Sequence, residues 1–126
     1  MIKFEMIGDK LIVPVQIEGE TYRFLLDTGA PNIISKHLDS ILRPKKLGTL
    51  NTTDAAGNRQ PLPVVSVSKL TFGEVEFSNT ATLVYDLDTS KIWQCLDIDG
   101  FIGSNMLRKS IIQIDTQTKT IILTDN

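Results

Sequence analysis

The chain has 126 residues, 41% of them hydrophobic and 22% charged, so we expect one globular domain over residues 1–126 with a modest core. Its formal net charge of −2 excludes the basic surface typical of proteins that bind nucleic acid or anionic membranes. Cys95 is the only cysteine, which excludes an internal disulfide and a cysteine-rich zinc cluster. We therefore expect no metal and no cofactor.

The first six residues, Met1–Met6, are too few and too charged for a signal peptide, and no apolar run reaches membrane-spanning length. As written, the chain is expected to be soluble and cytoplasmic. A signal sequence removed from a periplasmic or secreted precursor would leave no trace, so those locations stay open.

Two strand-like runs open the domain. Leu11–Ile17 and Tyr22–Leu26 are rich in aliphatic and aromatic residues, and the turn-favouring Glu18–Thr21 between them predicts a hairpin. Pro14 cannot donate to a β-ladder, so the first strand is expected at a sheet edge or bulged there.

An acidic turn follows the second strand directly. Asp27 ends the apolar run and Thr28 and Gly29 favour a turn, so a carboxylate is placed at a strand end. The Thr28 hydroxyl and the Gly29 backbone could hold it there. Taken by itself, the triplet also fits an ordinary Asx turn.

A short helix is predicted next, capped by Ser35, running to about Leu42 and ended by Pro44. His37, the only histidine, falls in the exposed first turn, which disfavours a Ser-His-Asp or Cys-His arrangement built on it. Thr49–Pro63 is polar and rich in turn formers, consistent with a surface loop.

Further short strands predict an all-β fold. They are Val64–Phe72, with Val65, Val67 and Leu70 as the inward candidates, then Val75–Phe77 and Thr80–Tyr85. A final hairpin is expected from Ile111–Asp115 and Thr120–Leu123.

The acidic segment from Asp86 to Asp99 resembles a calcium-binding loop only superficially. Lys91 occupies the place where such a loop needs glycine, and Asp97 is shorter than the required glutamate. A solvated acidic loop is the default, within which Trp93 packs over the sheet or lines a substrate subsite.

A second motif follows at Asp99–Leu107. Phe101 and Ile102 are expected to enter the core, Gly103 permits a close backbone approach, and Ser104–Lys109 predicts a short helix.

Two segments together resemble the signatures of the retropepsin-like aspartic proteases. They are Leu25-Leu26-Asp27-Thr28-Gly29-Ala30 with Ile33–Ser35, and Asp99–Leu107. The resemblance spans roughly residues 11–124. It implies a closed β-barrel with one or two short helices and a β-hairpin flap.

The resemblance also implies a role for several residues. Asp27 is the implied catalytic residue and Thr28, Gly29 and Ala30 support its loop; Ile102 and Gly103 pack behind it. The implied flap has its tip at Asp54–Asn58, with Ala55, Ala56, Gly57 and Asn58 facing substrate, and small residues suit such a lid.

Aspartic proteolysis requires two aspartates that share a proton and a water, and this chain has one Asp-Thr-Gly motif. An active protease must therefore pair Asp27 with Asp27 of a second copy in a homodimer that acts on a polypeptide substrate. The resemblance implies that Thr28 bonds across the subunits and that residues 1–6 and 119–124 interleave as strands.

Two positions depart from the family pattern: Pro31 stands where a small polar or acidic residue is usual, and Ser104 where the retroviral enzymes have arginine. Ala30 offers no hydroxyl to Asp27, which predicts a working pH closer to neutral than that of pepsin-like enzymes.

The alternative function is a weak or inactive module of the same fold that dimerises or binds a peptide strand. A monomer that awaits fusion to another domain is a third.

Overall fold

The computed structural model describes residues 2–27, 29–53, 57, 59–87, 95–103 and 110–125. Its elements, in chain order, are β1 (Ile2–Lys3), β2 (Glu5–Ile7), β3 (Lys10–Ile17), β4 (Glu20–Leu26), β5 (Ile33–Ser35), α1 (Lys36–Leu42), β6 (Lys45–Thr53), β7 (Arg59–Phe72), β8 (Val75–Tyr85), β9 (Gly100–Ile102), β10 (Ser110–Asp115) and β11 (Thr120–Asp125). The predicted all-β class is confirmed.

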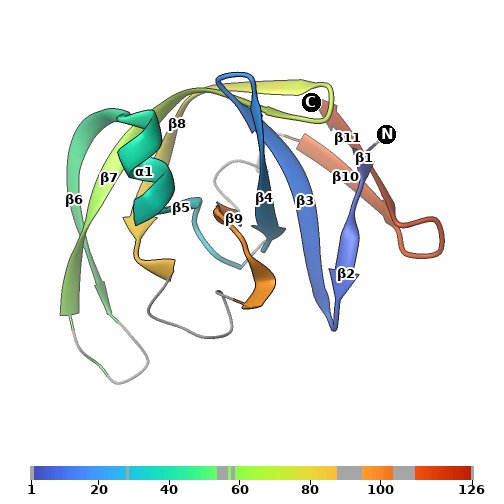
Figure 1. Cartoon of the computed structure of the whole chain (residues 1–126), viewed down its shortest axis with the longest axis horizontal. Helices are drawn as coiled ribbons and strands as arrows, with labels where there is room; N and C mark the ends of the chain where they lie inside the picture. Colours follow the sequence, from blue (N-terminus) through green and yellow to red (C-terminus); the bar gives the residue numbers. More distant parts are fainter. Residues whose placement is uncertain are drawn as a thin grey trace.

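The strands form two sheets. The larger has the order β2-β3-β4-β9-β5-β8-β7-β6. In addition, β3 pairs with β7, which closes the strands from β3 to β7 into a ring. The result is a ring of strands from which β2 and β6 extend (Figure 1). The predicted Ser104–Lys109 helix lies outside the described residues.

The predicted β3–β4 hairpin is confirmed, with Ile12 opposite Leu25 and Ile17 opposite Glu20. The expectation that Pro14 places β3 at a sheet edge is wrong for the strand as a whole. β3 meets β2 before Pro14 and β7 after it. Pro14 lies in the gap between these two partial neighbours, where the missing N–H costs no ladder bond.

Helix α1 begins as predicted. The Ser35 hydroxyl accepts a hydrogen bond from the Leu38 backbone N–H at 3.0 Å, which satisfies one of the free donors of the first turn. Leu38 is completely buried and anchors the helix, whereas His37 is exposed. The helix ends at Arg43, whose left-handed backbone donates its N–H to the Asp39 carbonyl, just before Pro44.

A long hairpin replaces the surface loop that composition favoured for Thr49–Pro63. β6 and β7 pair from Lys45 opposite Ser66 to Thr53 opposite Arg59, with a register shift between Lys46 and Gly48. The predicted hairpin therefore exists, and the loop interpretation is wrong for its two strands. Of the predicted tip only Gly57 is described; it is exposed, with a left-handed φ of +85°.

The inward candidates of β7 are correct, since Val65, Val67 and Leu70 are all buried. The two strands expected over Val75–Tyr85 are instead one, β8, which pairs with β7 along its length. Asn79 has a φ of +51° within this strand, and the pairing with β7 keeps the same register on both sides of it.

The chain ends form the second sheet, in the order β1-β11-β10. Ile2 lies opposite Ile121 and Lys3 opposite Thr120, so the two terminal segments pair with each other within one chain. The predicted β10–β11 hairpin is confirmed. Figure 1 shows this sheet and the β6–β7 hairpin at opposite sides of the view.

No helix among the described residues is long and apolar enough to cross a membrane.

Candidate active site

The site is built where β9 inserts between the two strands that flank Asp27. β4 leads into Asp27 and runs parallel to β9, with Leu26 opposite Ile102. β5, which follows the turn, runs antiparallel to β9, with Ile33 opposite Phe101. Asp27 and residues 29–32, here called the Asp27 turn, therefore cross over the end of β9. The two motifs, some 70 residues apart in the sequence, are neighbours in the sheet (Figure 1).

Both faces of this three-strand unit are covered by apolar side chains, which explains its continuous apolar runs. One face contributes Phe24, Ile34 and Ile102 to the larger buried cluster of the protein. The other face contributes Leu25 and Phe101 to a second cluster with Leu87, Leu96 and Ile98. A strand covered on both sides has little freedom to shift, so the unit is a rigid base for the turn.

Asp27 is held at three atoms. Its backbone N–H donates to the Ile102 carbonyl at 2.9 Å, and its own carbonyl accepts from the Ala30 N–H at 3.2 Å. Its carboxylate oxygen Oδ1 accepts from the Gly29 N–H at 3.0 Å. The side chain remains half-buried, so the carboxylate is fixed in place yet accessible from one side.

Gly103 lies directly beneath the turn. A Cβ at this position would overlap the backbone of Ala30 and Pro31, so only glycine allows the turn to pass this closely. The predicted packing of Ile102 and Gly103 behind Asp27 agrees with this arrangement. Gly100 is similarly restricted, because a Cβ there would meet the Ile33 carbonyl and the Phe24 ring.

Asn32 is a site residue that sequence reasoning missed. It is 3% exposed, and its side-chain Oδ1 accepts a hydrogen bond of 2.7 Å from the Gly103 N–H. Its backbone carbonyl accepts from the Leu83 N–H at 2.9 Å. The signal that could have identified it is its place directly before the apolar run Ile33–Ile34. An amide at that place is expected to be buried, and a buried amide needs a hydrogen-bond partner.

Arg23 is a second residue that no sequence pattern indicates. Its guanidinium donates to both carboxylate oxygens of Glu5 at 2.9 Å, and to the carbonyls of Leu96 and Asp97 at 3.0 and 3.2 Å. It thereby ties β2 and the segment before β9 to β4. The Glu5 pair is exposed and contributes little by itself.

Asp99, the residue before β9, joins β4 to β5 through its backbone. Its N–H donates to the Arg23 carbonyl at 2.7 Å, and its carbonyl accepts from the Ser35 N–H at 2.8 Å. Burial raises the pKa of its carboxyl above the ordinary 3.8, although the Arg23 N–H, which donates to Oδ2 at 3.3 Å, opposes the shift.

The raised pKa of Asp99 predicts a pH-dependent stability. Because the folded state binds this proton more tightly than the unfolded state, the contribution is complete below pH 3.8 and is lost as pH rises through the folded-state pKa. Asp99→Asn keeps an oxygen acceptor for the Arg23 N–H and removes the titration. In urea denaturation between pH 3 and 7, the variant should gain stability relative to wild type as pH rises.

Asp115 is the control, because its pKa is shifted in the opposite direction to that of Asp99. The backbone N–H groups of Thr118 and Gln117 lower the pKa of its carboxyl, so its contribution is present above pH 3.8 and is lost as pH falls. Asp115→Asn should therefore lose stability relative to wild type as pH rises. Parallel pH profiles for the two variants would contradict both assignments.

The remaining predicted site residues are only partly described. At the turn, Gly29 is exposed and Ala30 is half-buried. Thr28, Ala55, Ala56 and Asn58 lie outside the described residues. So do Ser104 and residues 88–94 of the acidic segment, which include Trp93.

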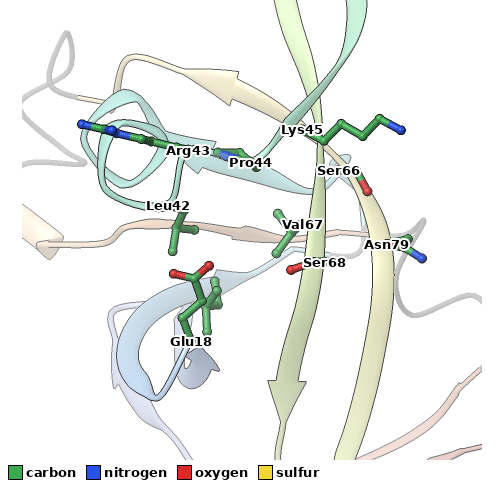
Figure 2. A pocket seen from close by; sticks show the side chains of 10 residues that line it. Glu18, Leu42, Arg43, Pro44, Lys45, Ser66, Val67, Ser68 and Asn79 are labelled. Carbon is green, nitrogen blue, oxygen red and sulfur yellow. The ribbon is translucent and has the colours of Figure 1, made fainter.

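A cavity of about 270 Å³ opens elsewhere on the surface (Figure 2). It lies among the β3–β4 turn, the end of α1 and β7, with Glu18, Leu42 and Val67 directed into it. None of its lining residues belongs to the Asp27 turn or to β9. Among the described residues, no three His, Cys, Asp or Glu side chains gather as a metal site.

Comparisons with known proteins agree with this geometry. The family model of aspartyl proteases matches residues 13–106. A retropepsin-like aspartic protease from Rickettsia conorii superposes with a TM-score of 0.65 at 19% identity, over 98% of this chain and 88% of that one. The retroviral protease-like domain of Ddi1 from Leishmania major superposes with a TM-score of 0.59 at 16% identity, over 93% and 89%.

No curated protein matches the sequence. The family match covers most of the chain, including the first motif and the second up to Met106, and the structural matches share the fold. The chain therefore belongs to the aspartyl protease family and has the retropepsin-like fold.

Proposed function

We propose that the protein is an aspartic endopeptidase whose site is completed by a second copy of the chain. The observation that carries this proposal is the Asp27 carboxylate, half-buried at the end of β4 and held by the Gly29 N–H at 3.0 Å. A carboxylate fixed in this way on a rigid base is suited to hold a water against a peptide carbonyl.

The chemistry requires a second carboxylate. Two aspartates that share one proton divide the work: the ionised one takes a proton from the attacking water, and the protonated one donates to the peptide carbonyl. The chain carries one Asp-Thr-Gly motif, at residues 27–29, so the second carboxylate is Asp27 of a partner related by a twofold axis.

The β6–β7 hairpin supports binding of an extended polypeptide. β6 is the last strand of the larger sheet, so one side of it has no ladder neighbour among the described strands. Leu47 and Leu50 on β6 are each about half exposed, at 53% and 52%. A hairpin of this form could close over a substrate strand and exclude bulk water from the dyad.

The terminal strands indicate how two copies of the chain could form a dimer. Within one chain, β11 already has β1 on one side and β10 on the other. β1 contributes only Ile2 and Lys3, so exchange of this short strand between copies would break few hydrogen bonds. The interleaved termini that the family resemblance implies would form by this exchange.

A peptide-binding module that does not cut is the second candidate, and the exposed edge of β6 favours it. One experiment separates the two. Wild type and Asp27→Asn are incubated with a peptide library, with and without a pepstatin-like inhibitor, and the products are identified by mass spectrometry. Cleavage by wild type alone, blocked by the inhibitor, supports the protease; peptide retention without cleavage by a confirmed dimer supports the binding module.

The working pH of the protease is expected closer to neutral than that of pepsin-like enzymes, because Ala30 supplies no hydroxyl to stabilise the ionised carboxylate. The protein is proposed to act in the cytoplasm.

A further inference from the structure

We propose that Asn32 is a positioning residue for Asp27, which it orients through the peptide unit between Ile102 and Gly103. The inference rests on the proposed function, because it assigns Asn32 a role in that reaction. Asn32 lies five residues beyond Asp27, at the point where the turn enters β5.

Both polar groups of this one peptide unit are bonded to the Asp27 turn. The Ile102 carbonyl accepts from the Asp27 N–H at 2.9 Å, and the Gly103 N–H donates to Asn32 Oδ1 at 2.7 Å. The unit is planar and rigid, so its two hydrogen bonds cannot reorient independently. The side chain of Asn32 and the backbone of Asp27 are thus mechanically linked through β9.

Gly103 makes this link necessary. It has no side chain of its own to fix the end of β9, and the backbone of Ala30 and Pro31 occupies the space where one would lie. Without an acceptor at position 32, the buried Gly103 N–H would lose its partner and the peptide plane would be free to rotate. The Asp27 N–H, bonded to the other end of that plane, would follow.

Asn32 is itself well anchored. Its side chain is 3% exposed, and its backbone carbonyl accepts from the Leu83 N–H on β8 at 2.9 Å. A neutral amide supplies the acceptor without the cost of burying a charge. Because the side chain is buried beneath the turn, substrate cannot touch it, and its loss should change kcat rather than KM.

The test compares three variants. Asn32→Leu has nearly the same size but no acceptor. Asn32→Asp keeps an oxygen at the same position, and burial there favours its neutral, protonated carboxyl, so no charge is buried. Ser35→Ala removes a different buried hydrogen bond, the cap on the Leu38 N–H. Dimer content is matched by sedimentation before kinetics. We expect Asn32→Leu to lower kcat by about 10- to 100-fold, since displacements of about 1 Å cost that much.

KM should stay within about twofold of wild type in Asn32→Leu, and Asn32→Asp should recover most of kcat. Ser35→Ala should lose stability but keep kcat. Three results would each overturn the positioning role. They are a loss of kcat in Asn32→Leu no greater than that in Ser35→Ala, a rise in KM of Asn32→Leu as large as its loss of kcat, and a kcat of Asn32→Asp as low as that of Asn32→Leu.

An NMR measurement tests the link without any activity. In amide spectra of the full chain, Asn32→Leu should shift the Gly103 and Asp27 amide protons and speed their exchange with solvent, whereas Asn32→Asp should preserve their protection. An Asp27 amide unchanged in Asn32→Leu would overturn the proposal. If wild type cleaves no peptide, the proposed function fails, and these amide signals still decide whether Asn32 orients the turn.

Discussion

Asp27→Asn should lower kcat by at least about 10²- to 10⁴-fold, because it removes both the general base and the shared proton of the dyad. The substitution is conservative for the fold. The asparagine Oδ1 can still accept the Gly29 N–H bond that the carboxylate accepts at 3.0 Å, and the backbone bond to Ile102 is unaffected. Stability and dimer content should therefore stay close to wild type, as thermal unfolding and sedimentation would show.

Asp39→Asn is the matched control for this loss. It removes an aspartate charge from α1, away from the turn, and should leave cleavage unchanged. Initial rates on the best peptide of the library measure both variants. Cleavage by purified Asp27→Asn at a rate near that of wild type would show that Asp27 is not the catalytic group.

Gly103→Ala should cause a large loss of stability. The added Cβ would overlap the backbone of Ala30 and Pro31, and backbone cannot move aside as a flexible side chain can. Overpacking of this kind costs about 1–3 kcal/mol or more. For a domain of this size we expect the melting temperature to fall by about 5 °C or more.

Gly29→Ala tests whether the turn is destabilised by any added side chain or only by one at Gly103. Gly29 lies outside the left-handed region, and among the described residues its Cβ would come near Asp27 Oδ1, at an ordinary contact distance of 3.5 Å. Its stability should change by no more than about 0.5 kcal/mol. Calorimetry of the two variants is sufficient, and equal losses from both would refute the close approach of the turn to β9.

Local chemistry predicted the first half of the site. Three features depend only on neighbouring residues: the strand before Asp27, the turn at Gly29 and the helix cap at Ser35. All three are found as expected. The second motif at Gly103 was recognised by its resemblance to a family, and its packing beneath the turn agrees with that resemblance.

Long-range pairing was not predictable in the same way. The apolar Phe101 and Ile102 predict a place in the core, but not the insertion of β9 between β4 and β5, because the choice of partner strands depends on the whole sheet. The roles of Asn32 and Arg23 depend on groups 71 and about 74 residues away. Val75–Phe77 and Thr80–Tyr85 are predicted as two strands because the pairing with β7, which joins them into one strand, lies outside their own sequence.

The central claim is that two chains each contribute one Asp27 to a shared site. The most direct measurement mixes a fixed amount of wild type with increasing Asp27→Asn, with substrate in large excess, and follows the rate of peptide cleavage. A shared dyad predicts that the rate falls toward zero as mixed dimers, each with a single Asp27, replace the wild-type dimers. A rate that stays constant under a large excess of the variant would show that one chain supplies the whole site.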